Sequence, residues 1–251
     1  MMSMKIIGSD YDGTLNHNGI DEKKKQQLEL WRSKGNVFAI ISGRFRRDLI
    51  EVYAAKQFPC DFLIADSGAV IMKTDGTAVS EIRCDACVVV PLLNKLFEWG
   101  CPWGNIDTAF PCKVYADGEE CTDEGEYTLE TMPEVSYFNQ ISTALPDDET
   151  AAKVTRLIRE HFGAQLNPLQ NGTCLDIVRA DMDKAQGLRI LADYLGADYS
   201  DIIAVGDNVN DSDMIREFRS YAMENGVDQI KTLADFITPG VGELIEKELA
   251  E

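Results

Sequence analysis

Four clusters of polar residues in this chain carry side chains suited to phosphate or metal chemistry. The first is Asp10-Tyr11-Asp12-Gly13-Thr14-Leu15, in which two carboxylates stand two residues apart. At the exit of a strand, such a pair can face one crevice and hold Mg²⁺, which prefers oxygen ligands. Gly13 permits the backbone bend that this exit needs. Asp-x-Asp-Gly is also common in ordinary turns, so this motif alone leaves both interpretations open.

The second cluster is Ser42-Gly43-Arg44, which directly follows an apolar run. A hydroxyl followed by N–H groups at the start of a helix is a natural cradle for phosphate. Arg44 can add a charge-assisted hydrogen bond. The alternative is an ordinary helix N-cap, for which serine is among the best residues.

The third and fourth clusters lie in the last third of the chain. Lys184 begins a helix, where a lysine is usually solvated, but a phosphoryl site among carboxylates needs a fixed positive charge. Gly206-Asp207-Asn208-Val209-Asn210-Asp211 crowds polar side chains after another apolar run. Asp207 can complete a metal site with Asp10, and Asp211 can support the metal ligands through hydrogen bonds.

The elements around these clusters predict an α/β fold. Apolar runs at 4–9, 36–41, 62–65 and 202–205 read as strands, with helices between Gly19 and Gly35, over 44–55 and from 183 onward. This alternation predicts a doubly wound, Rossmann-like parallel sheet with crossover helices. Three of the four clusters follow the C-terminal end of a predicted strand, which is where open α/β sheets bind ligands. Segments 69–72 and 78–82, joined through Asp75-Gly76, predict a hairpin.

The middle of the chain has a different pattern. We expect helices over 88–99 and after the acidic segment 146–149, and short strands at 113–116, 134–141 and 173–178. This mixture indicates a small α+β domain inserted into the doubly wound one. The predicted domains are therefore a core formed by residues 1–82 and 183–251, and an inserted domain formed by residues 83–182.

Charge and composition exclude some partners. The net charge is −19, from 24 basic and 43 acidic side chains, whereas nucleic acids and anionic membranes attract basic surfaces. No apolar run approaches the ~20 residues of a membrane span, and the N-terminal residues do not resemble an export signal. We therefore expect a cytoplasmic monomer or homodimer with no nucleic-acid or membrane partner.

Seven cysteines are scattered along the chain. Cys84-x-x-Cys87 suggests zinc or redox chemistry, but no second such pair follows and neither histidine stands at a ligand-like spacing. Buried free thiols are the default expectation.

Taken in order, the four clusters closely resemble the motifs of the haloacid-dehalogenase-like hydrolase superfamily. The inserted domain looks like the cap of its Cof-type, or type IIB, branch. The resemblance extends from Lys5 to about Leu249 and includes 221–226, which is similar to the strand that follows the last motif. One departure is Asp66-Ser67-Gly68-Ala69, where relatives usually have Asn-Gly-Ala.

The resemblance implies a role for each carboxylate. Asp10 would be the nucleophile, and Asp12 would protonate the leaving oxygen and then activate water. Mg²⁺ would be held by Asp10, the backbone carbonyl of Asp12, and Asp207. Asn210 and Asp211 match the pair that supports these metal ligands.

The resemblance also implies phosphate ligands, namely Ser42, Gly43, Arg44 and Lys184. Arg44 could instead contact the rest of the substrate. The cap would select the substrate, with Gln170, Asn171 and Thr173 as candidate contacts.

The implied function is a Mg²⁺-dependent phosphatase that hydrolyses a small organic phosphomonoester through an aspartyl-phosphate on Asp10. Sugar phosphates are the leading substrate class, followed by nucleotides and by phosphorylated cofactors such as pyridoxal phosphate. The alternatives are a sugar phosphomutase of the same superfamily, a receiver-like phosphoacceptor, and a non-catalytic phosphate-binding module.

Overall fold

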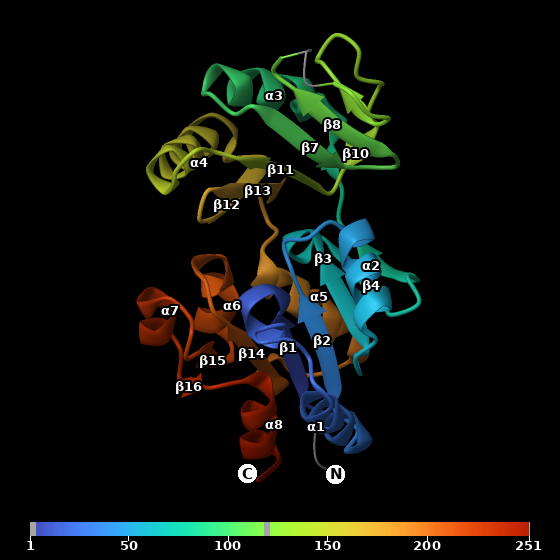
Figure 1. Cartoon of the computed structure of the whole chain (residues 1–251), viewed down its shortest axis with the longest axis vertical. Coiled ribbons are helices and arrows are strands. Elements are labelled where there is room, and N and C mark those ends of the chain that lie inside the picture. Colours follow the sequence, from blue (N-terminus) through green and yellow to red (C-terminus); the bar gives the residue numbers. More distant parts are fainter. Residues whose placement is uncertain (1–3, 118–120, 251) are drawn as a thin grey trace. The chain divides into compact units, whose positions relative to one another are not determined.

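The computed structural model describes residues 4–117 and 121–250, and the chain divides into two compact units (Figure 1). The first, here called the core unit, combines Met1–Ser80 with Lys184–Glu251. The second, the insert unit, is formed by Glu81–Asp183. The insert unit is thus one continuous segment that interrupts the core unit in sequence.

An eight-stranded sheet runs through the core unit, in the order β16-β15-β14-β1-β2-β3-β4-β5 (Figure 1). The strands from β16 to β3 are parallel to their neighbours, and β4 is antiparallel to β3. Their bounds are β1 Ile6–Asp10, β2 Val37–Ile41, β3 Phe62–Ala65, β4 Val70–Lys73, β5 Ala78–Glu81, β14 Ile202–Gly206, β15 Arg219–Met223 and β16 Phe236–Thr238. The predicted doubly wound α/β fold is confirmed.

Both faces of this sheet are covered by helices. The central strands β1, β2, β3 and β14 are buried at every residue, as expected for parallel strands between two helical layers. Consecutive strand residues point to opposite faces of the sheet, so Ile6 and Ile7 belong to different hydrophobic clusters. One cluster includes residues of α1 Glu22–Ser33, α2 Arg46–Lys56 and α8 Val241–Ala250, and the other includes residues of α5 Lys184–Leu195, α6 Ser212–Glu217 and α7 Asp228–Leu233.

The insert unit contains a six-stranded sheet in the order β12-β13-β11-β7-β8-β9 and a separate pair, β10-β6. The bounds are β6 Cys84–Asp85, β7 Trp103–Asp107, β8 Pro111–Tyr115, β9 Glu126–Tyr127, β10 Tyr137–Phe138, β11 Gln140–Ala144, β12 Leu166–Asn171 and β13 Cys174–Arg179. Helices α3 Val89–Glu98 and α4 Asp148–Phe162 share one hydrophobic cluster with this sheet. Asp147 caps α4 by accepting a hydrogen bond from the Thr150 N–H at 2.7 Å, in keeping with the predicted acidic start.

The insert unit differs from the prediction in its strands. Neither β7 nor β12 was predicted from the sequence. Pro168 lies inside β12, and a proline argues against a strand because it cannot donate a ladder hydrogen bond. The predicted strand 134–141 was also wrong in extent, because the chain forms the short β10 and then β11, which continues to Ala144.

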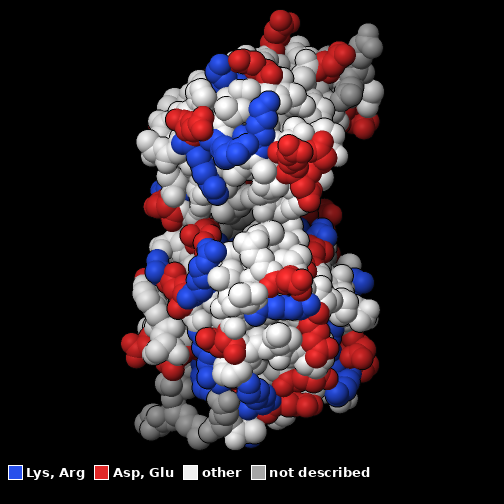
Figure 2. All heavy atoms as spheres, turned by 90° about the vertical axis from the view of Figure 1, so that its left-hand side faces the viewer, with Lys and Arg blue, Asp and Glu red and all other residues white. Residues whose placement is uncertain are grey.

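Two surface properties bear on possible partners. None of the helices among the described residues combines the length and the apolar character needed to cross a membrane. On the face drawn in Figure 2, Lys and Arg side chains are interspersed with Asp and Glu side chains over both units. Such mixed charge is typical of a solvated surface.

Candidate active site

Three of the predicted clusters meet at one edge of the core sheet. Asp10 ends β1, and β1 pairs in parallel with β2 on one side and β14 on the other. The register aligns Asp10 with Ile41, so Ser42 is the next residue past the paired end of β2. On the other side, Asp207 follows Gly206, the last residue of β14. The parallel register therefore brings the carboxyl ends of these strands, and the polar residues after them, to one place.

The segment Tyr11–Leu15 forms a tight turn directly after β1. Gly13 has φ +83°, a conformation that L side chains rarely adopt. A Cβ at this position would also collide with the carboxylate of Asp207. The hydroxyl of Thr14 donates to Asp207 Oδ1 at 2.7 Å, and Asn225 Nδ2 donates to the Gly13 carbonyl at 2.9 Å. The turn is thus fastened to the loops that follow β14 and β15.

Lys184 is the cation at the centre of the site. It begins α5, and its side chain is only 1 % exposed. Its ammonium lies 2.6 Å from Asp10 Oδ1 and 2.5 Å from Asp211 Oδ1. The predicted alternative, a solvated lysine at a helix start, is therefore wrong for this residue. A buried lysine is tolerated because two carboxylates surround it.

Burial shifts the pKa values of Asp10, Lys184 and Asp207. Burial raises the pKa of Asp10 to about 8, with the charge of Lys184 opposing the shift and that of Asp211 adding to it. Burial lowers the pKa of Lys184, but the charges of Asp10 and Asp211 outweigh it, so this pKa lies above that of an ordinary lysine. Burial also raises the pKa of Asp207. The site therefore holds more negative charge than one lysine compensates, and a cation bound here would favour the ionised carboxylates.

Asp211 organises the loop after β14. Its side chain is fully buried. One oxygen accepts from Lys184, and the other accepts from the backbone N–H groups of Asp207 and Asn208 at 2.9 Å and 3.1 Å. A Cβ at Gly206 would collide with this carboxylate. Asn210 is half-buried in the same turn.

A divalent metal fits the carboxylates of this site. Asp10, Asp207 and Asp211 each offer an oxygen, and these three atoms lie within 4.8 Å of one another. Hydrogen-bond donors already engage both oxygens of Asp211. The pair Asp10 and Asp207 is therefore better suited to ligate a metal directly, while Asp211 is suited to fix the loop that carries Asp207. An all-oxygen donor set is the kind that Mg²⁺ prefers.

Asp12 and Arg44 form an ion pair that the sequence analysis did not predict. Arg44 Nε lies 2.7 Å from Asp12 Oδ2, and Arg44 Nη2 lies 2.9 Å from Asp12 Oδ1. Both side chains are partly exposed, 39 % for Arg44 and 52 % for Asp12. From the sequence, Arg44 was expected to contact phosphate or substrate. In this structure its guanidinium holds the carboxylate of Asp12 through Nε and Nη2.

The loop after β3 adjoins the Ser42-Gly43-Arg44 segment. The Asp66 N–H donates to the Arg44 carbonyl at 2.9 Å, and the Ser67 N–H donates to the Ser42 carbonyl at 3.0 Å. Asp66 and Ser67 have φ values of +51° and +52°, a left-handed conformation that asparagine tolerates better than serine does. Ser42 is buried, and its Oγ accepts from the Arg44 N–H at 3.2 Å. The Ser42-Gly43-Arg44 segment is thus held in place by a neighbouring loop.

The residues expected to contact substrate from the insert unit cluster at one hairpin. Gln170 and Asn171 end β12, and Thr173 precedes β13. The Gln170 amide donates to the Asp148 and Gly172 carbonyls at 3.1 Å and 3.0 Å. Its described contacts therefore brace the hairpin, and contact with a substrate stays a prediction.

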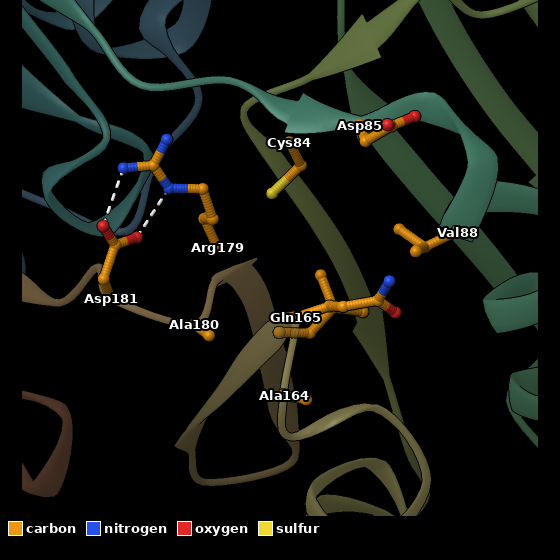
Figure 3. A pocket seen from close by; sticks show the side chains of 9 residues that line it. Cys84, Asp85, Val88, Ala164, Gln165, Arg179, Ala180 and Asp181 are labelled. Atoms are coloured by element: carbon orange, nitrogen blue, oxygen red, sulfur yellow. Dashed lines mark hydrogen bonds and ion pairs between the residues drawn. The ribbon is translucent and has the colours of Figure 1, made fainter.

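The insert unit contains a cavity of about 400 Å³ that includes none of the motif residues (Figure 3). Cys84 and Val88 line it, and Arg179 and Asp181 pair through two hydrogen bonds at its edge. Burial raises the pKa of Cys84 to about 12, so its thiol is unreactive at neutral pH. All seven cysteines are free. Among the described residues, the acidic triad is the group arranged so that it could hold a metal ion, and Cys84 and Cys87 belong to no such group.

Two residues that position the site were not predicted from the sequence. Thr14 belongs to the first motif but had no predicted role there, and it contacts Asp207. Asn225 lies two residues after β15 and holds Gly13. A signal for Asn225 exists in the sequence, because it is a polar residue just past β15, and three of the four clusters likewise follow a strand.

Comparison with known proteins agrees with this geometry. The family model for haloacid dehalogenase-like hydrolases matches residues 7–243. The chain is 26% identical over 264 residues to 5-amino-6-(5-phospho-D-ribitylamino)uracil phosphatase YbjI of Escherichia coli (strain K12), an alignment covering 99% of this chain and 97% of that protein.

Solved structures share the fold over nearly the whole chain. A haloacid dehalogenase-like hydrolase from B. subtilis superposes with a TM-score of 0.81 at 19% identity, covering 97% of this chain and 99% of that chain. The HAD subclass IIB sugar phosphatase BT4131 superposes with a TM-score of 0.78 at 16% identity, covering 97% and 98%. The chain therefore belongs to the haloacid dehalogenase-like hydrolase family and is a phosphatase, as its four motifs predicted.

Proposed function

We propose that the protein is a Mg²⁺-dependent phosphatase that hydrolyses a small phosphomonoester through an aspartyl-phosphate on Asp10. The observation that carries this proposal is the position of Asp10. Its carboxylate ends the central strand of the sheet, is paired with Lys184, and lies within an acidic cluster. A carboxylate at such a place is suited to attack phosphorus while a fixed cation stabilises the transferring oxygens.

In the first step, an oxygen of Asp10 bonds to phosphorus and the ester P–O bond breaks. Asp12 gives a proton to the departing alkoxide, so the alcohol leaves in neutral form. Lys184 and the Ser42 hydroxyl bind the phosphoryl oxygens. For Asp12 to act, it must leave the ion pair with Arg44, which then becomes available to a substrate anion.

In the second step, Asp12 accepts a proton from water, and the water oxygen bonds to phosphorus. The bond between phosphorus and the Asp10 oxygen then breaks, which releases inorganic phosphate and restores both carboxyl groups to their starting states. Splitting the hydrolysis into two displacements lowers the barrier of each.

Asp10, Asp207 and the backbone carbonyl of Asp12 would hold Mg²⁺, with Asn210 and Asp211 supporting their positions. When bound, the metal neutralises the repulsion between the Asp10 carboxylate and the anionic phosphate. The chain carries a net charge of −19, and its overall field repels phosphate. A cation that neutralises this repulsion is therefore needed at the site.

For the substrate we propose a phosphorylated sugar or sugar alcohol. The E. coli relative is named for a substrate with phosphate on a ribityl chain, and one structural neighbour is named a sugar phosphatase. Both names indicate a phosphate carried by a polyhydroxylated carbon chain. Nucleotides and pyridoxal phosphate are the next classes to test. The nearest alternative function is a phosphomutase, which would require a bisphosphate activator.

Removing the metal is expected to abolish activity. Phosphate release should be measured for sugar phosphates, sugar-alcohol phosphates, nucleotides, pyridoxal phosphate and p-nitrophenyl phosphate. EDTA should reduce the rate to background, and excess Mg²⁺ should restore it, because the carboxylates of Asp10 and Asp207 repel an anion without a cation between them.

Turnover that survives exhaustive chelation would contradict the metal site. Phosphate transfer that depends on an added sugar bisphosphate, without net phosphate release, would identify the mutase instead. The Asp10→Asn variant serves as the blank for contaminating phosphatases.

A further inference from the structure

A short loop joins the catalytic turn to helix α1. The turn Tyr11–Leu15 runs into residues 16–19, where Asn18 and Gly19 have φ values of +57° and +83°. Backbone hydrogen bonds from Asn16 to the Tyr11 carbonyl (2.9 Å) and from His17 to the Thr14 carbonyl (3.2 Å) tie the loop to the turn. Movement of the loop would therefore be transmitted to the segment that carries Asp12.

Lys24 holds this loop through its ammonium group. Nζ lies 2.9 Å from the Leu15 carbonyl, 3.2 Å from the His17 carbonyl and 2.7 Å from the Gly19 carbonyl. An ammonium group has three donors, so the three carbonyls satisfy it completely. Burial lowers the pKa of Lys24, while the charges of Asp21 and Glu243 oppose this shift. A half-buried lysine that donates hydrogen bonds to three backbone carbonyls is held in one position, whereas a solvated lysine side chain is not.

The position of Lys24 on α1 is itself fixed. Asp21 caps the helix by accepting from the Lys24 N–H at 2.8 Å, which places Lys24 in the first turn. A positive charge there opposes the helix dipole, so its placement needs a compensating contact. Its neighbours Lys23 and Lys25 contact the carboxylates of Glu243 and Glu22 instead. Lys24 alone among these three consecutive lysines turns back onto the loop.

We propose that Lys24 is a positioning residue for the reaction, acting as a clamp that holds the turn Tyr11–Leu15 from the side of α1. The turn is also held by hydrogen bonds from Thr14 to Asp207 and from Asn225 to Gly13. With the turn fixed at Gly13, Thr14 and Leu15, the backbone of Asp12 keeps a constant place relative to Asp10. This inference rests on the proposed function, because it concerns the geometry of the same two carboxylates.

The test compares Lys24→Met with Lys23→Met. Both variants replace a lysine by methionine on the same helical turn, but only Lys24 contacts the loop. Lys24→Met is expected to lower kcat about ten- to a hundred-fold, the scale of a small misplacement of a catalytic group. KM should change less than about two-fold, because Ser42 and Lys184, which bind the phosphate, are untouched. Lys23→Met should match the wild type in both constants.

A second readout is independent of activity. Hydrogen exchange monitored by mass spectrometry should show faster exchange for peptides spanning residues 11–20 in Lys24→Met, and unchanged exchange in β2, β3 and β14. Lys23→Met should show the wild-type pattern throughout. Circular dichroism at the assay temperature confirms that the variants compared are folded.

The outcomes separate this inference from the proposed function. Wild-type kcat and exchange in Lys24→Met would overturn the clamp and leave the phosphatase intact. Faster exchange throughout the protein would also overturn it, since Lys24 would then serve global stability. If the wild-type protein proves inactive on every phosphate ester, the proposed function fails, and the exchange of residues 11–20 still decides whether Lys24 holds the turn.

Discussion

Asp10→Asn is expected to abolish turnover while the protein remains folded. The amide nitrogen and the neutral carbonyl oxygen of asparagine cannot replace the carboxylate as a nucleophile, so kcat should fall by about 10⁴-fold or more. The fold should survive because the amide oxygen can still accept a hydrogen bond from Lys184, whose charge stays paired with Asp211. Phosphate release on the best substrate and circular dichroism measure the two effects.

Asp228→Asn is the matched control for this variant. Asp228 is exposed in the first turn of α7 and lies outside the proposed site, so the same change of charge should leave kcat unaltered. A fully active Asp10→Asn protein would refute Asp10 as the nucleophile. An unfolded Asp10→Asn protein would contradict the expectation that Lys184 and Asp211 suffice to hold this part of the core.

Lys184→Met is expected to cause the largest loss of stability. It leaves the buried carboxylates of Asp10 and Asp211 without the cation between them, and breaking a buried ion pair by removing one partner costs about 3–5 kcal/mol. Unfolding in urea should show this loss in the free energy of unfolding. Activity should also vanish, because the transferring phosphoryl group loses its fixed positive charge.

The double variant Lys184→Met/Asp211→Asn tests the cause of that loss. Replacing one of the two buried carboxylates that Lys184→Met leaves without a cation should recover part of the stability, since the repulsion between Asp10 and Asp211 disappears. A Lys184→Met protein within about 1 kcal/mol of the wild type would mean that these charges are not coupled in the folded protein. A double variant less stable than Lys184→Met would mean that the hydrogen bonds from Asp211 to its own loop matter more than its repulsion of Asp10.

The core fold and much of the site could be predicted because their signals are local. Apolar runs such as Ile202–Val205 indicate buried strands, and polar residues directly after them indicate the edge where ligands bind. Parallel register then brings Asp10, Ser42 and Asp207 together without any further information. The burial of Lys184 between two carboxylates could not be predicted, because it depends on three-dimensional packing.

Other features could not be predicted because they depend on contacts between distant segments. The ion pair of Asp12 with Arg44 joins residues 32 positions apart, and the bond from Asn225 to Gly13 joins residues 212 apart. In the insert unit, β12 contains Pro168 and β7 contains Gly104. Both residues are unfavourable in strands, so cross-strand pairing overrides the local preference there.

The most direct test of the central claim is to find the phosphoryl group on Asp10. The Asp12→Asn variant cannot activate water, but p-nitrophenyl phosphate has a good leaving group that needs little protonation. The variant should therefore form the aspartyl-phosphate with Mg²⁺ and hydrolyse it slowly. Mass spectrometry of acid-quenched protein should find one added phosphoryl group, on the peptide that contains Asp10. Release of p-nitrophenolate from a protein that stays unmodified, or modification at another residue, would contradict the account.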